Sequence, residues 1–225
     1  MVTILLPVYN DERYIGECIN SIKTQTHRDF LCFIGFNGTI DGSKEIAGLL
    51  TSNDPRFKIF DYGGDKGKPK TLNKLLKEVT TEFICLIDGD DVWEPSKLEK
   101  QFELRNNFSI IGTFTSYIDE NGNNIRNLDL PREDSEIKNG LITGYNYIVN
   151  SSAFFRTSDA LEINGWDEGL DFLEDYDIWL RLYKNNKTFF NIKEYLVKHR
   201  IHSGSNFNSK PSNISIPELL TKNKI

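Results

Sequence analysis

The stretch Phe83-Ile84-Cys85-Leu86-Ile87-Asp88-Gly89-Asp90-Asp91 decides the fold, because an apolar run passes directly into three closely spaced carboxylates. A short continuous apolar run is typical of a strand buried on both faces of a parallel sheet. Carboxylates so close together repel one another unless a cation or solvent relieves the repulsion. Because Mg²⁺ and Mn²⁺ prefer oxygen ligands, we interpret the stretch as a central strand that ends at a metal site, with a solvated acidic turn as the alternative.

Three further apolar runs precede this one, and helical patterns separate them. We expect strands at residues 2–6, 30–35, 57–60 and 83–87, and helices with apolar stripes at 15–22, 46–50 and 72–79. Asp11 is a candidate N-cap for the first helix. The alternation predicts an α/β fold with a parallel sheet covered by helices on both faces, and such sheets bind ligands beyond the carboxyl ends of their strands. The segments that we expect to converge there are Pro7, Asn37, the loop 63–69 and Asp88.

The second half of the chain is less regular. We expect a strand at 109–119 with a hairpin turn at Asn121-Gly122, a strand at 153–156 and a helix at 174–183. From about residue 206 the chain is polar, and the sequence does not decide between a lid over the site and a tail. Because 225 residues without an internal repeat or low-complexity linker suit one large α/β unit, we predict a single domain.

The composition narrows the classes of function. The net charge of −6, from 27 basic and 33 acidic residues, argues against a nucleic-acid binder, which needs a basic face. No apolar run approaches the ~20 residues of a membrane helix, so we expect no transmembrane segment, while peripheral membrane contact stays open. Cys18, Cys32 and Cys85 lack metal-ligand spacing and lie in apolar segments, which indicates buried thiols in a reducing, cytoplasmic compartment.

The acidic stretch, with Pro95 and Leu98 downstream, resembles the nucleotide-sugar metal motif of the family 2 glycosyltransferases, which have the GT-A fold. Other segments are similar to that family's motifs, in the family's order: 7–10, 37–43, 155–156, 165–168, 174–181 and 200–205. The resemblance implies one GT-A domain over 1–225, with a Rossmann-like, mostly parallel central sheet flanked by helices and a smaller acceptor-side region of sheet and helix. It implies a nucleotide-sugar-binding half at about 1–92, an acceptor-binding half at about 93–205 and a lid or tail at about 206–225.

The resemblance also implies a metal-dependent, inverting glycosyltransferase. Its donor is a nucleoside-diphosphate sugar, with a UDP-sugar favoured, and its acceptor is a hydroxyl of a glycan, or of a lipid-linked or protein-linked molecule. A divalent cation, Mn²⁺ or Mg²⁺, neutralises the leaving pyrophosphate as a Lewis acid. Asp175, beside Glu174, is the implied general base, and a single displacement inverts the anomeric centre. From the residues alone, both acids also suit a helix N-terminus, whose dipole favours negative charge.

The implied metal site lies around the acidic stretch. Asp90 binds the metal, Asp88 faces the ribose, and Asp91 assists either of them. His202 completes the metal shell or contacts the pyrophosphate, with Arg200 beside it as a phosphate ligand.

The implied donor pocket contains one departure from the family. Asn37 stands where the family commonly has an Asp that accepts a hydrogen bond from uracil, and an Asn oxygen accepts without charge assistance. Lys68 is either a phosphate ligand or a solvated lysine, Asn73 is either a donor contact or a polar residue on a helix face, and Trp166 is implied to stack on a sugar. The residues expected to contact the donor are Pro7, Val8, Tyr9, Asn37, Lys68, Asn73, Asp88, Gly89, Trp166 and Arg200.

Two other functions share parts of this pattern. A sugar-1-phosphate nucleotidyltransferase needs a Gly-rich basic loop after its first strand, and Pro7-Val8-Tyr9-Asn10 is not such a loop. A binding module that kept the fold and lost activity is favoured by Phe36-Asn37, while the pairs Asp88/Asp90 and Glu174/Asp175 argue against it.

Overall fold

The strands and helices follow the order that the apolar runs predict in the first half of the chain. The computed structural model describes residues 1–64, 67–170, 172–204 and 212–225. The strands are β1 (Val2–Val8), β2 (Phe30–Phe36), β3 (Phe57–Asp61), β4 (Phe83–Leu86), β5 (Val92–Trp93), β6 (Ile110–Ile118), β7 (Asn124–Leu128), β8 (Phe154–Arg156) and β9 (Phe189–Arg200). The helices are α1 (Ile15–Lys23), α2 (Ser43–Thr51), α3 (Lys68–Glu78), α4 (Lys97–Leu104), α5 (Asp134–Thr143), η1 (Asn150–Ser152), α6 (Thr157–Glu162), α7 (Glu174–Lys184) and α9 (Ile216–Lys222).

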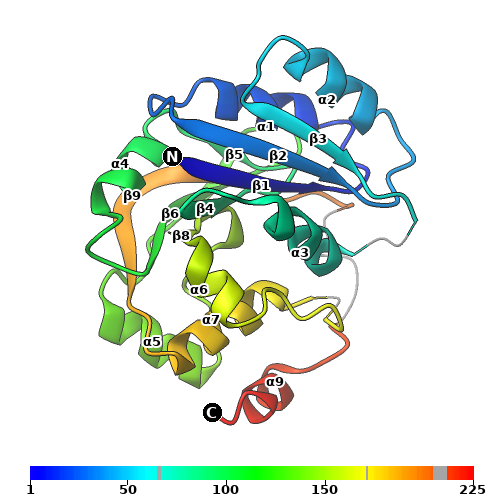
Figure 1. The fold of residues 1–225 in the computed structure, drawn as a ribbon. Helices are drawn as coiled ribbons and strands as arrows, with labels where there is room; N and C mark the ends of the chain where they lie inside the picture. Colours follow the sequence, from blue (N-terminus) through cyan, green and yellow to red (C-terminus); the bar gives the residue numbers. More distant parts are fainter. Residues whose placement is uncertain (65–66, 171, 205–211) are drawn as a thin grey trace.

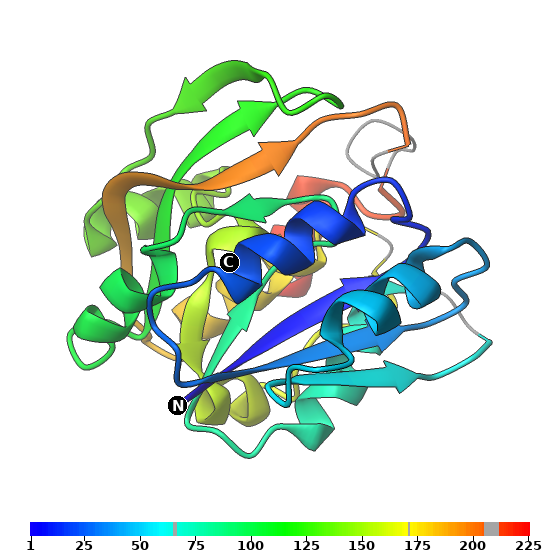
Figure 2. The ribbon, with the colours of Figure 1, turned by 90° about the horizontal axis from the view of Figure 1, so that it is seen from above.

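All of these strands join one sheet, in the order β3-β2-β1-β4-β8-β6-β9-β5, with β7 paired to β6 (Figures 1 and 2). The run from β3 to β4 is parallel, and β8 is antiparallel to both β4 and β6. The predicted α/β fold, its four parallel strands and its three helices are therefore confirmed. The hairpin at Asn121-Gly122 is confirmed as well, with φ of +85° at Gly122.

Side chains of β1 alternate between two apolar cores, as the twofold period of a strand requires. Ile4 and Leu6 pack with α1 on one face, whereas Leu5 packs with α3 and α7 on the other. In Figure 1 helices α1 and α2 lie above the sheet, and α3 and α7 lie below it. Because both faces are covered, the exposed ends of the strands are where ligands have access.

The C-terminal segment contains a helix that is fixed to the rest of the molecule. Ser215 caps α9 by accepting a hydrogen bond from the backbone N–H of Glu218. Leu219 is fully buried, and the Asn223 amide donates to Asp177 in α7 at 3.0 Å. The sequence left a lid and a tail as alternatives for the segment after about residue 206. Residues 206–211 lie outside the described residues, and Asn223, at the end of α9, contacts α7.

Within the described ranges, no helix combines the length and the apolar character that a membrane span requires.

Candidate active site

The acidic turn after β4 is held at the carboxyl end of the parallel strands by η1 and α3. The backbone N–H of Asp88 donates to Ser151 Oγ at 3.0 Å, and the Asn150 amide donates to the Asp88 carboxylate at 3.2 Å. Lys68 Nζ lies 2.7 Å from Asp88 Oδ1. Asn150 and Ser151 were not predicted as site residues, because only the fold brings η1 behind this turn.

Gly89 leaves room for the Asp11 carboxylate, which a side chain at this position would displace. A Cβ at Gly89 would lie 2.4 Å from Asp11 Oδ2. Burial and the neighbouring Asp90 raise the pKa of Asp11 well above its ordinary value. Asp11 therefore does not cap α1 through its side chain, as we expected, but faces the acidic turn. The sequence signal was its place directly after the strand-end segment Pro7–Asn10.

Asp90 and His202 lie on the less buried side of the turn, with side chains 16% and 13% exposed. His202 Nε2 lies 3.1 Å from Asp90 Oδ2, and the His202 ring packs on Tyr14 with centroids 4.7 Å apart. Burial and then Asp91 raise the pKa of Asp90, while His202 opposes the rise. A cation near Asp90 would relieve this unfavourable charge.

Asp91 points into the protein and does not fit the predicted metal role. Its carboxylate is fully buried, accepts from the Arg200 backbone N–H at 2.9 Å and lies 3.1 Å from His199 Nδ1. Burial raises the pKa of Asp91, but His199 and the hydrogen bonds outweigh it and hold that pKa below its ordinary value.

Arg200 does not fit the predicted phosphate contact either. Its side chain is 1% exposed, and its guanidinium donates to the Asp90 and Asp119 carbonyls and to Glu17. Arg200 thus links the end of β9 to the buried side of the acidic turn.

The start of α7 faces the turn across Lys68. Lys68 Nζ lies 3.2 Å from Glu174 Oε1, so one ammonium contacts both Asp88 and Glu174. The next residue, Asp175, accepts a hydrogen bond from the Asn146 amide at 3.0 Å. Burial and Glu174 raise the pKa of Asp175 to about 7, although Lys68 lowers it. Such a carboxylate is suited to general base catalysis near neutral pH.

The predicted nucleobase pocket lies at the ends of β1 and β2. Pro7 and Val8 are buried in β1, and Tyr9 is 43% exposed. Asn37 is 1% exposed, and within the described part of the chain neither its amide nitrogen nor its oxygen has a hydrogen-bond partner. Buried polar atoms normally have partners, so this amide has hydrogen-bonding capacity that the described residues leave unused.

Trp166 and Asn73 connect α3 to the loop after α6. Trp166 is 2% exposed, so its ring does not fit the predicted stacking on a sugar. Asn73 accepts from the Trp166 backbone N–H at 2.9 Å and donates to the Trp166 carbonyl at 2.8 Å. Asn73 is thus a polar residue of α3 that fixes this loop, and its contact with the donor stays a prediction.

Among the described residues, no three His, Cys, Asp or Glu side chains converge as a complete metal cage. Asp90 and His202 nevertheless lie side by side, with Asp88 in the same turn. Mg²⁺ is usually held by one or two carboxylates together with substrate phosphates. The residues present therefore fit a cation that arrives with a nucleoside diphosphate.

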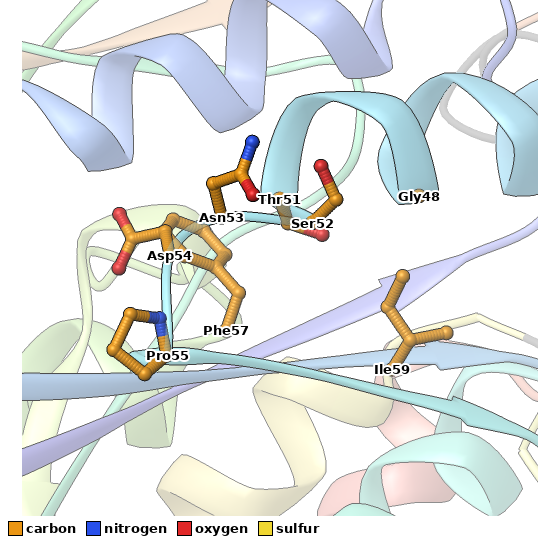
Figure 3. A pocket seen from close by; sticks show the side chains of 8 residues that line it. All are labelled: Gly48, Thr51, Ser52, Asn53, Asp54, Pro55, Phe57 and Ile59. Atoms are coloured by element: carbon orange, nitrogen blue, oxygen red, sulfur yellow. The ribbon is translucent and has the colours of Figure 1, made fainter.

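An open hollow of about 500 Å³ lies between the end of α2 and the start of β3 (Figure 3). It is at the amino-terminal end of β3, whereas the site above is at the carboxyl ends of the strands. Its lining contains none of the predicted site residues, so it is not part of the candidate site.

Residues 3–162 match the family model of Glycosyl transferase family 2. The chain belongs to this family. The family 2 chain is 31% identical to the O-antigen biosynthesis glycosyltransferase WbnJ of Escherichia coli, over 100% of this chain and 91% of that protein. It is 30% identical to the uncharacterized glycosyltransferase MJ1057 of Methanocaldococcus jannaschii, over 93% of this chain and 74% of that protein.

Solved structures of glycosyltransferases share the fold of this family 2 chain. S. aureus TarS 1–349 in complex with UDP-GlcNAc superposes with a TM-score of 0.75 and 18% identity, covering 93% of this chain and 61% of that one. The mannosyltransferase PcManGT of Pyrobaculum calidifontis, in complex with GDP-Man and Mn²⁺, gives a TM-score of 0.70 and 14% identity, covering 91% and 58%. This chain is thus shorter than either neighbour, and the predicted GT-A fold and family are confirmed.

Proposed function

We propose that this glycosyltransferase is metal-dependent and inverting, and that it moves a sugar from a nucleoside-diphosphate sugar to a hydroxyl of a glycan or glycoconjugate. The observation that carries the proposal is the position of Lys68, whose ammonium contacts Asp88 and Glu174 together. It joins the acidic turn to the helix that bears Asp175. Donor-binding and proton-accepting groups therefore share one site at the sheet edge.

Each end of this site has a chemical task in the proposed transfer. Asp175 accepts the proton of the acceptor hydroxyl as that oxygen attacks the anomeric carbon, on the side opposite to the departing nucleoside diphosphate. Asp90 and His202, with Asp88, would hold the cation, which when bound neutralises charge on the pyrophosphate. When cation and donor bind, the two carboxylates that now contact Lys68 contact the cation and the donor instead. The Lys68 ammonium then adds a positive charge beside the phosphates.

The partners follow from the same site. We propose a UDP-sugar donor, because the Asn37 side-chain oxygen, which has no partner among the described residues, can accept a hydrogen bond from uracil N3–H. A glycan acceptor is supported by the relative named for O-antigen biosynthesis. The buried free thiols of Cys18, Cys32 and Cys85 support a reducing, cytoplasmic setting.

UDP is expected to raise the melting temperature only when Mn²⁺ or Mg²⁺ is present, by an amount that corresponds to about 2.7 kcal/mol at a hundredfold excess over Kd. Asp90→Ala is expected to abolish the metal-dependent part, because the variant loses the carboxylate beside His202. Thermal denaturation with UDP, GDP, dTDP and CMP, each in Mn²⁺ or in EDTA, measures both effects. Glu103→Ala, an exposed change in α4, is the control. Equal stabilisation by UDP in EDTA would contradict the metal role.

Asn37→Asp tests the recognition of the base. An unpaired buried carboxylate should lower the melting temperature of the free protein, because burial without a partner is costly. The same carboxylate should tighten UDP binding about three- to tenfold, since a hydrogen bond to a charged acceptor is stronger than one to an amide. Isothermal titration with UDP and GDP checks this, and tighter binding of GDP alone would show that the base is not uracil.

A further inference from the structure

The proposed acceptor half contains an exposed aromatic ring, that of Tyr145, whereas the ring of Trp166, which the sequence predicted for sugar stacking, is buried. Trp166 is 2% exposed, whereas Tyr145, in the loop after α5, is 61% exposed. The rings of Tyr145 and Tyr147 are stacked, with centroids 6.0 Å apart and planes 7° apart. Tyr147 packs against Gly140, where a Cβ would come within 2.2 Å of its ring. The stack is thus supported from beneath, and Tyr145 presents its ring to the outside.

Asn146 places this aromatic loop beside Asp175. Its side-chain oxygen accepts from the backbone N–H of Ile148 at 3.0 Å, which directs the amide nitrogen outward. That nitrogen donates to Asp175 Oδ2 at 3.0 Å. Tyr145 is thus the neighbour in sequence of a residue that contacts the proposed general base.

An open hollow of about 500 Å³, a size typical of small-molecule sites, adjoins the same loop. Ile216 Cγ2, in its lining, is 3.4 Å from the Cβ position of Gly144, and Leu173, also in the lining, is two residues before Asp175. In Figure 1 the helix α9 that contributes to it lies beneath α7. The lining mixes apolar residues with polar ones: Leu173, Ile214 and Ile216, and Ser212, Asn213, Ser215 and Glu218.

We propose that the Tyr145 ring and this hollow form the site for a hexose ring of the acceptor. A pyranose has an apolar C–H face, which suits an aromatic ring, and a hydroxylated edge, which suits amide, hydroxyl and carboxylate groups. The polar lining favours a sugar over a purely apolar lipid chain. The inference rests on the proposed function, since it is Asp175 that makes the neighbouring hydroxyl the acceptor.

Fluorine NMR of protein labelled with 3-fluorotyrosine tests the site, with the Tyr145 signal assigned through Tyr145→Phe. Methyl α- and β-glucosides, galactosides and mannosides are titrated to tens of millimolar. At least one of them should shift the Tyr145 signal saturably and leave that of Tyr195, a less exposed tyrosine on β9, in place. A Tyr145 signal that stays fixed with every glycoside, or moves only in parallel with Tyr195, would overturn the proposal.

Ligand-observed saturation transfer with the same glycosides gives a second measurement without the label. Tyr145→Ala should weaken binding about tenfold, equivalent to about 1.4 kcal/mol, whereas Tyr195→Ala should not change it. Equal binding by wild type and Tyr145→Ala would also overturn the proposal. Stabilisation by UDP and Mn²⁺, measured on each sample, reports the donor site separately, so loss of the acceptor site is distinguished from failure of the proposed function.

Discussion

Replacing Asp175 with Asn is expected to lower the rate of sugar transfer by about 10²–10⁴-fold, the range for loss of a positioned general base. Asn has the same shape, so the variant should keep its fold and its stabilisation by UDP and Mn²⁺. Initial rates with donor and acceptor in excess measure the loss. Because the rate falls while donor binding persists, the result also separates an active enzyme from a module that only binds nucleotide.

The pH dependence of kcat/KM gives the same prediction a second readout. Burial and Glu174 raise the pKa of Asp175 to about 7, and the base must be ionised to accept a proton. The rate should therefore fall as pH drops below about 7, and Asp175→Asn should lack that acid limb. Glu45→Gln, which removes an exposed acid in the first turn of α2, is the matched control for a general effect of helix N-terminal charge. Transfer by Asp175→Asn at the wild-type rate would disprove the assignment.

The sequence was sufficient to predict the part of the sheet that is buried on both faces. β1, β2 and β4 are continuous apolar runs, and the helices between them show one clear apolar stripe each. β9 was not predicted, because residues 193–195 in its middle are exposed and interrupt any apolar pattern. Its place is fixed by pairing with β6, some 80 residues earlier, and no local periodicity contains that information.

The positions of the site residues were easier to predict than the directions of their side chains. Strand ends and the start of α7 located Asp88, Lys68 and Glu174, which the structure brings together. Trp166 lies in a predicted loop but turns into the core, because Asn73 holds its backbone from α3. Asn146 has no motif of its own, and its contact with Asp175 exists only through the fold.

Replacing the adjacent residues Asp90 and Asp91 with Ala, one at a time, should change the free energy of unfolding in very different ways. Asp91→Ala is expected to lower the free energy of unfolding by about 3 kcal/mol, because it leaves His199 and the Arg200 backbone N–H without their buried partner. Asp90→Ala should leave this free energy unchanged or raise it, since burial and like charge already disfavour ionised Asp90. Urea denaturation of both variants without metal or nucleotide measures the difference.

The pH dependence of the free energy of unfolding tests whether the Asp91–His199 pair is the source of this stability. Asp91 opposes burial and raises the pKa of His199 from 6.5 to about 9, so the stability from the pair is complete below pH 6.5 and is lost as pH rises through 9. On the acid side, the lowered pKa of Asp91 means that the contribution is present above pH 3.8 and is lost as Asp91 is protonated at lower pH. The difference between wild type and Asp91→Ala should thus be largest between about pH 4 and 6.5 and should shrink toward pH 9. If Asp91→Ala instead kept its stability and lost the Mn²⁺-dependent effect of UDP, Asp91 would be a metal ligand and its inward contacts would be replaced when the donor binds.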